Sequence, residues 1–93
     1  MKEELLKIIN HYGIMPQLKY IHSEYFELDE AIIECEESGN NPEYYKESIG
    51  GEIADVMVML KQFQYYYGIE DKQIEDIMKF KIERQLKRID DER

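Results

Sequence analysis

The sequence predicts an all-α protein whose helices form a small bundle. Apolar residues recur at steps of three and four along most of the chain, which places them on one face of a helix. Clusters of Gly, Pro and Asn divide the chain into four segments, and strand-like alternation is scarce. With 93 residues the chain is long enough for one domain only, residues 1–93. The core of so short a chain is thin, so we expect a four-helix bundle that is completed by homo-oligomerisation.

The first two helices are predicted at about residues 2–12 and 16–38. The first helix is too short to be stable alone, so its apolar stripe must dock on another part of the protein. That stripe consists of Leu5, Ile9 and Tyr12. The second helix begins near Pro16, which suits a first helical turn, and ends before Gly39.

Two neighbouring stripes follow the second helix. The apolar stripe, which we expect to form the bundle seam, contains Leu18, Ile21, Tyr25, Leu28, Ile32 and Cys35. A second stripe, rotated by about 100° from the first, contains Glu24, Glu27 and Ala31. The carboxylates therefore flank the predicted core instead of facing open water.

The third helix, at about residues 42–67, repeats this arrangement. Its apolar stripe contains Ile49, Ile53, Val56, Leu60, Phe63 and Tyr67, and its neighbouring stripe contains Glu52, Asp55 and Met59. Residues 56–60 are apolar on every face, which predicts a turn that is covered on all sides. The pair Gly50-Gly51 is unusual inside a helix. It indicates a kink, a delayed helix start or a close approach by a ligand or another backbone, and the alternative is a loop that ends near Gly51.

The fourth helix is predicted at about residues 70–91 and has a cationic end. One face starts apolar and becomes polar along its length, through Ile74, Ile77, Lys81, Gln85 and Arg88. A parallel stripe that can supply core contacts contains Met78, Ile82 and Ile89. Lysine and arginine are suited to binding phosphate, as a point charge and as a two-pronged donor respectively.

Two acidic pairs, Glu24/Glu27 and Glu52/Asp55, are the candidate functional residues. Each pair is spaced i, i+3 and therefore shares one helix face. Antiparallel packing of the second and third helices lets the pairs meet, and four converging carboxylates favour a hard divalent cation such as Mg²⁺. No Cys or His lies at matching spacing, which disfavours a softer metal. Spacing alone does not exclude a solvated helix face, because the chain has 21 acidic residues and Glu34/Glu37 shows the same pattern.

Composition excludes several classes of partner and site. The formal net charge of −9 argues against nucleic acid and against an anionic membrane surface, since both require a basic footprint. Cys35 is the only cysteine, so there is no intramolecular disulfide or Cys-based zinc site, and its place on an apolar stripe predicts burial. We see no signal peptide and no run of transmembrane length, and we expect a cytoplasmic protein.

The motifs together resemble the MazG-like family of all-α nucleoside triphosphate pyrophosphohydrolases. The resemblance rests on Glu-Tyr-Phe-Glu-Leu-Asp-Glu-Ala-Ile from Glu24 and, most specifically, on Glu-Ile-Ala-Asp-Val-Met-Val-Met-Leu from Glu52. A late motif, Lys81-Ile-Glu-Arg-Gln85-Leu-Lys-Arg88, completes it, with Gln85 where the family usually has Asn. The resemblance covers about residues 17–88.

This resemblance implies a function and a set of site residues. The residues of the two acidic pairs would hold Mg²⁺, with Mn²⁺ as a substitute, and form the catalytic site. Lys81, Gln85 and Arg88 would bind the substrate phosphates in a site shared between subunits. The implied enzyme is a homodimer or homotetramer that splits an NTP or dNTP into monophosphate and pyrophosphate.

Two alternatives to this function remain open from the sequence. One is a related all-α pyrophosphatase that acts on dUTP, dCTP or phosphoribosyl-ATP. The other is a non-catalytic acidic helical interaction module. The three consecutive tyrosines Tyr65 to Tyr67 suit core packing or a subunit interface more than stacking on a base.

Overall fold

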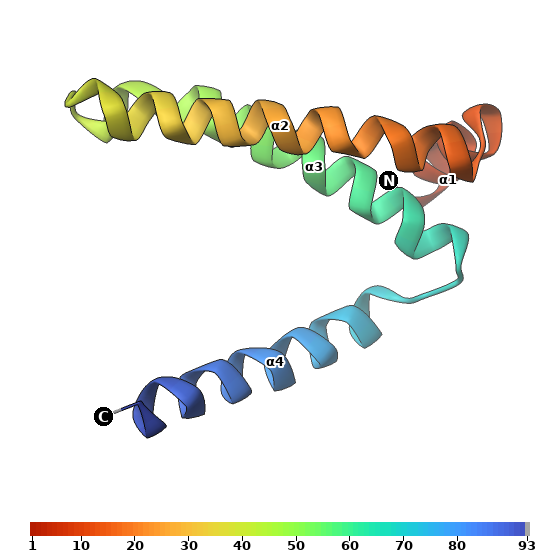
Figure 1. The fold of residues 1–93 in the computed structure, drawn as a ribbon. Helices are drawn as coiled ribbons and strands as arrows, with labels where there is room; N and C mark the ends of the chain where they lie inside the picture. Colours follow the sequence, from red (N-terminus) through yellow and green to blue (C-terminus); the bar gives the residue numbers. More distant parts are fainter. Residues whose placement is uncertain (93) are drawn as a thin grey trace.

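The computed structural model describes residues 1–92, and these residues form helices joined by short turns (Figure 1). The elements are α1 (Lys2–Tyr12), α2 (Ile14–Ser38), the 3₁₀ helix η1 (Pro42–Tyr45), α3 (Lys46–Tyr66) and α4 (Asp71–Asp91). No strand occurs among the described residues, so the all-α prediction is confirmed. None of the described helices is both long and apolar enough to cross a membrane.

The turns are made by the glycines and the Asn-Pro pair that the sequence places between segments. Gly13 alone joins α1 to α2 with φ of 93°, so α2 begins two residues before the predicted Pro16. Gly39 ends α2 in the left-handed conformation, with φ of 72°. The side chain of Asn41 then accepts a hydrogen bond of 3.0 Å from the backbone N–H of Glu43 and caps η1.

Helix α3 runs through Gly50 and Gly51 without interruption. The alternatives of a loop ending near Gly51 and of a delayed helix start are therefore wrong. A Cβ atom built on either glycine would meet no atom within 4 Å, so no other residue within 1–92 requires glycine there.

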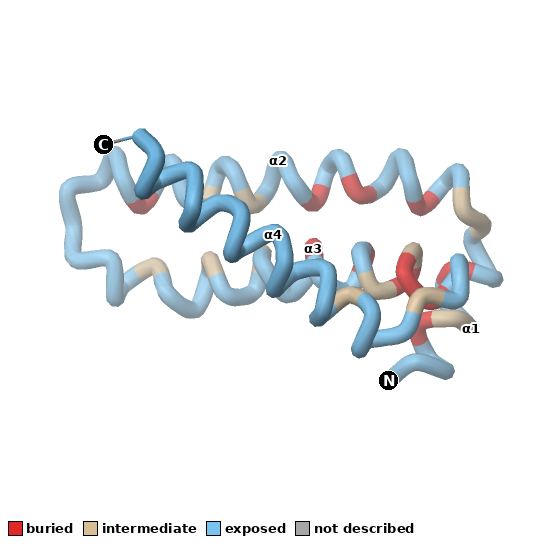
Figure 2. Tube along the Cα trace, turned by 90° about the horizontal axis from the view of Figure 1, so that it is seen from below, coloured by how far each residue is buried: buried red, intermediate tan, exposed pale blue. Residues whose placement is uncertain are grey.

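Helices α1, α2 and α3 pack together and form the core. The long helices α2 and α3 lie side by side and antiparallel, and α1 packs against both near the start of α2 (Figure 1). Buried positions gather where these three helices meet (Figure 2). The buried apolar residues are Leu5, Ile9, Ile21, Cys35, Val56, Met59 and Tyr65. The predicted burial of Cys35 is confirmed.

The contact between α2 and α3 is rotated from the predicted seam toward the carboxylate stripes. On α2 the buried residues are Gln17, Ile21, Glu24 and Cys35, whereas Leu18, Tyr25 and Ile32 of the predicted seam are exposed. On α3 the buried residues include Val56, Met59 and Gln62. Ile53 and Leu60 of the predicted stripe are exposed, as is Tyr67 directly after the helix. The acidic residues thus lie in the contact itself, and a large share of the apolar stripe faces outward.

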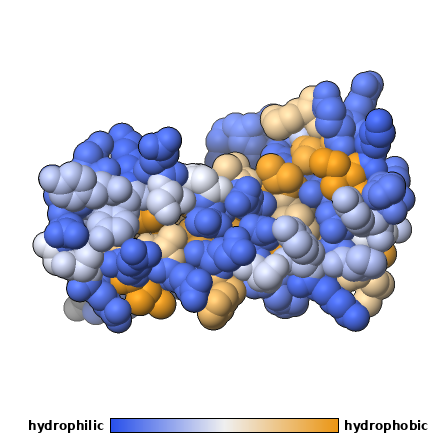
Figure 3. Space-filling model, turned by 90° about the horizontal axis from the view of Figure 1, so that it is seen from above, coloured by the Kyte–Doolittle hydropathy of each residue, from blue (hydrophilic) through white to orange (hydrophobic). Residues whose placement is uncertain are grey.

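The prediction that residues 56–60 are covered on all sides is wrong for the single chain. Val56 and Met59 are buried, but Met57, Val58 and Leu60 are exposed. Only one side of this turn meets α2, and α4, which would cover another side of a closed bundle, lies apart. Figure 3 shows that hydrophobic side chains lie among hydrophilic ones on one face of the molecule.

Helix α4 projects away from the other three helices (Figure 1). Among the described residues, no Cα atom of α4 lies within 8 Å of a Cα atom in another helix. Its direction is set at the corner with α3, where the Asp71 carboxylate accepts hydrogen bonds from Lys61 Nζ (2.5 Å), Gln64 Nε2 (2.8 Å) and the Tyr65 hydroxyl (2.8 Å). These donors, Lys61 foremost, hold the pKa of Asp71 well below its usual range.

Candidate metal centre and adjoining pocket

The structure brings the two acidic pairs together across the contact between α2 and α3. One carboxylate oxygen from each of the four residues lies within 4.8 Å of the others. We call this group, which consists of Glu24, Glu27, Glu52 and Asp55, the acidic cluster. The i, i+3 spacing keeps each pair on one side of its helix, and the antiparallel packing sets the pairs opposite each other.

Two oxygens of the acidic cluster are buried without a partner. The side chain of Glu24 is almost fully enclosed, since the residue is 7% exposed, and its Oε2 atom accepts no hydrogen bond from any residue of the described part of the chain. The Oε2 atom of Glu52 is also buried, and it too has no hydrogen-bond partner among the described residues. No Lys, Arg or His within residues 1–92 forms an ion pair with any member of the cluster. Burying an unpaired carboxylate costs free energy, so this arrangement needs a cation or a proton.

The electrostatics of the acidic cluster confirm that its charges repel one another. Burial raises the pKa of the Glu52 carboxyl, and the negative charges of Glu27, Asp55 and Glu24 raise it further. The Glu24 carboxylate, together with burial and the negative charges of Glu27 and Asp55, raises the pKa of the Tyr20 hydroxyl. The cluster is therefore a region of negative potential that a divalent cation would relieve.

The donor atoms fit a hard divalent cation. All four are carboxylate oxygens, which Mg²⁺ and Mn²⁺ prefer, and neither His nor Cys belongs to the cluster. Glu24 is buried and Glu52 half-buried, whereas Glu27 and Asp55 are exposed. One side of the site is therefore held in the helix contact, and the other side is open to solvent.

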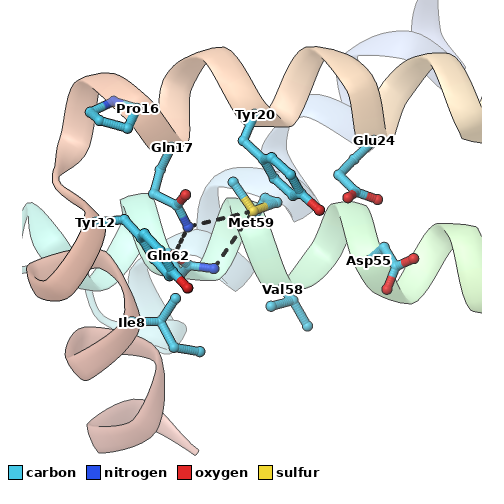
Figure 4. A pocket seen from close by; sticks show the side chains of 10 residues that line it. All are labelled: Ile8, Tyr12, Pro16, Gln17, Tyr20, Glu24, Asp55, Val58, Met59 and Gln62. Carbon is cyan, nitrogen blue, oxygen red and sulfur yellow. Dashed lines mark hydrogen bonds between the residues drawn. The ribbon is translucent and has the colours of Figure 1, made fainter.

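A pocket of about 530 Å³ adjoins the acidic cluster, between α1, α2 and α3 (Figure 4). Glu24 and Asp55 line this pocket and also belong to the cluster, so the two features are continuous. The remaining wall is mainly apolar and aromatic, with Ile8, Tyr12, Pro16, Tyr20, Val58 and Met59.

Two buried glutamines also line the pocket. Gln17 Nε2 donates a hydrogen bond of 2.8 Å to Gln62 Oε1 and thereby links α2 to α3. Both amides lie near the Met59 sulfur, at 4.0 Å from Gln17 Nε2 and 3.6 Å from Gln62 Nε2 (Figure 4).

These glutamines are not among the site residues predicted from the sequence, although their spacing carries a signal. Gln17 lies seven residues before Glu24, and Gln62 lies seven residues after Asp55. Each amide therefore falls on the same helix face as a member of the acidic cluster.

The residues predicted to bind phosphate lie elsewhere. Lys81, Gln85 and Arg88, which we call the phosphate set, are exposed on α4. The structure does not bring them to the acidic cluster of the same chain, because α4 projects away from α2 and α3 (Figure 1).

The three consecutive tyrosines do not line the pocket. Tyr65 is buried and its hydroxyl binds Asp71, in agreement with the packing role favoured from the sequence. The rings of Tyr66 and Tyr67 meet edge to face, with centroids 5.1 Å apart.

Comparison with known proteins yields no relative. No protein-family model, no curated protein and no solved structure matches this chain. The resemblance to the MazG-like family therefore stays a prediction that rests on the residues themselves.

Proposed function

We propose that this protein is a Mg²⁺-dependent nucleoside triphosphate pyrophosphohydrolase of MazG-like type. It would hydrolyse an NTP or dNTP to the monophosphate and pyrophosphate in the cytoplasm. The observation that carries the proposal is the acidic cluster, in which four carboxylates converge and two buried oxygens lack any partner. A solvated helix face, the alternative weighed from the sequence, would not bury Glu24 or place Glu52 Oε2 out of reach of water.

The residues of the acidic cluster have separate roles in this proposal. Glu24 and Glu52, held in the helix contact, would anchor Mg²⁺, which screens phosphate charge and lowers the pKa of a bound water. An exposed carboxylate outside the metal shell, Glu27 or Asp55, would accept the proton of the attacking water. Water adds to a phosphorus atom at the α–β anhydride, the bridging P–O bond breaks, and pyrophosphate and monophosphate leave.

The phosphate set would come from a second copy of the chain. Lys81 and Arg88 are exposed on α4, which meets α3 at the Asp71 corner and otherwise projects away from the described helices. Their positive charges complement a metal-bound triphosphate beside the acidic cluster of a partner. Pairing in a homodimer or homotetramer would also cover the outward-facing apolar residues of α2, α3 and α4.

Pyrophosphate release with Mg²⁺ tests the proposal, using a panel of nucleoside triphosphates that includes dUTP and dCTP. We expect release from at least one nucleotide and its loss in the double variant Glu52→Ala, Asp55→Ala. The matched control is Glu34→Ala, Glu37→Ala, which removes an exposed pair of the same spacing on α2. If no nucleotide yields pyrophosphate, or if both double variants keep equal activity, the proposal is wrong.

A further inference from the structure

We infer that the pocket beside the acidic cluster receives the nucleobase, and that the buried Gln17–Gln62 pair recognises the hydrogen-bonding edge of the base. The inference rests on the proposed function and adds specificity-determining residues to it. The pocket is continuous with the acidic cluster, because Glu24 and Asp55 belong to both the cluster and the pocket wall. A nucleotide whose phosphates lie at the cluster would therefore extend its nucleoside into this pocket.

The size and lining of the pocket fit a planar ligand. Its volume of about 530 Å³ falls in the range of small-molecule sites, which are mostly apolar with a few polar groups that fix orientation. Tyr12 and Tyr20 border it, and these two residues are 60% and 53% exposed. Exposed aromatic rings next to a cavity are suited to stacking on a base.

The amide pair supplies the polar groups. Gln62 is 1% exposed and Gln17 is 8% exposed, although both border the pocket. Their mutual hydrogen bond uses Gln17 Nε2 and Gln62 Oε1. Among the described residues, Gln17 Oε1 accepts no hydrogen bond and Gln62 Nε2 contacts only the Met59 sulfur. One acceptor and one donor thus remain, and nucleobase edges present neighbouring donors and acceptors of the same kind.

A purely structural link between α2 and α3 is the competing explanation for the pair. The double variant Gln17→Met, Gln62→Met separates the two explanations. Replacing both partners by apolar groups of similar shape leaves no buried amide unpaired, so the fold should persist, which a melting curve checks. The same change removes every donor and acceptor that the pair offers to a base.

The kinetic test compares kcat/KM across nucleoside triphosphates with the four common bases and for inorganic tripolyphosphate, which has no base. In the double variant we expect the ratio between the best and worst base to fall by about tenfold to hundredfold, the size of one base-edge contact. Hydrolysis of tripolyphosphate should be unchanged. A folded double variant that keeps the wild-type preference, or a wild type without any preference, would overturn the inference.

A binding test without metal or catalysis separates this inference from the proposed function. Nucleosides that carry no phosphate are titrated into ¹⁵N-labelled protein, and the side-chain amide resonances are followed. We expect those of Gln17 and Gln62 to shift and that of Gln73, exposed at the start of α4, to stay in place. Shifts without hydrolysis of any triphosphate would leave the pocket assigned and the proposed enzyme wrong. Hydrolysis without shifts would overturn the pocket assignment alone.

Discussion

Within the acidic cluster, the repulsion between carboxylates is expressed in the pKa of Glu52. Burial and three negative neighbours raise the pKa of Glu52 in the folded protein above its ordinary value of 4.5. The folded state therefore holds this proton more tightly than the unfolded state. By linkage, the free energy of unfolding falls as pH rises through the interval between the two pKa values and stays reduced at neutral pH. A bound cation offsets this loss.

Replacing Glu52 by Gln should therefore stabilise the protein without metal. At pH 7.5 we expect a higher melting temperature for Glu52→Gln than for the wild type, and a smaller difference at pH 4, where the wild-type carboxyl is protonated. Mg²⁺ at one hundred times its Kd should stabilise the wild type by about 2.7 kcal/mol and the variant much less. Differential scanning fluorimetry measures both effects, with Glu34→Gln as the control. A variant that melts below the wild type at pH 7.5 without metal would contradict this account.

At the scale of the helix, Gly51 weakens α3 without any packing reason in the same chain. A Cβ atom there meets no atom within 4 Å, and its backbone is helical. Gly51→Ala should then raise the free energy of unfolding by about 0.5–1 kcal/mol, because alanine loses less backbone entropy in a helix. Urea unfolding gives the value. A loss of stability or of oligomer mass would instead show that a second chain approaches α3 at this residue.

The corner between α3 and α4 depends on a carboxylate whose pKa is lowered. A lowered pKa stabilises the fold above the ordinary value of 3.8 for Asp71, and this contribution disappears as pH falls through the folded-state pKa. We expect Asp71→Asn to melt at a lower temperature than the wild type at pH 7 and the gap to narrow in acid below pH 3.8.

Asp76→Asn is the matched control for the corner. It removes an exposed carboxylate of α4 that forms an ion pair with Lys72, four residues earlier. Such pairs contribute about 0.3–0.5 kcal/mol, so the control should shift the melting temperature little. Equal effects of the two substitutions would mean that the hydrogen bonds at the corner do not stabilise the fold.

Sequence reasoning succeeds where the rule is local and fails where two helix faces compete. Gly39 and the pair of residues 41–42 define the turn, and i, i+3 spacing defines each acidic pair, so the helices and the convergence of the carboxylates follow. The rotation of α2 against α3 does not follow. Both helices carry two stripes that can be buried, and only the packed structure shows that Glu24 and Gln17 face α3 whereas Leu18 faces outward. The direction of α4 cannot be predicted from the sequence either, because it depends on the three donors that surround Asp71 in the folded structure.

At the scale of the whole molecule, the single chain is more open than a compact monomer. Its radius of gyration is 16.5 Å, whereas a compact domain of this length has about 12 Å. Its accessible surface is 7626 Å², whereas a compact monomer of 11.3 kDa has about 5,700 Å². The excess of about 1,900 Å² is the amount that each subunit buries in a large obligate homodimer.

The oligomeric mass in solution checks this estimate. Sedimentation equilibrium at micromolar concentration should give at least twice 11.3 kDa. The double variant Ile82→Glu, Leu86→Glu, which places charge on the exposed apolar side of α4, should shift the protein toward smaller species. A wild-type mass of 11.3 kDa would contradict the expected oligomer.

Mixing two inactive variants tests whether each site is shared between subunits. One variant, Glu52→Ala, Asp55→Ala, lacks metal ligands but keeps an intact phosphate set. The other variant, Lys81→Ala, Arg88→Ala, keeps the acidic cluster intact but lacks the two cations of the phosphate set. In a mixed dimer, the intact acidic cluster of one subunit meets the intact α4 of its partner. Half of the dimers in an equal mixture are mixed and each contains one complete site, so the activity should recover to about one quarter of the wild type.

The mixture recovers activity only if the phosphate set of one chain acts at the acidic cluster of its partner. If α4 folds back onto the acidic cluster of its own chain, every site in the mixture lacks one component and the activity stays at the level of the separate variants. The subunits must exchange before the assay, which dilution and reconcentration of the mixture accomplish. Recovery that grows with the time of exchange would show that the carboxylates and the cations of one site come from different chains.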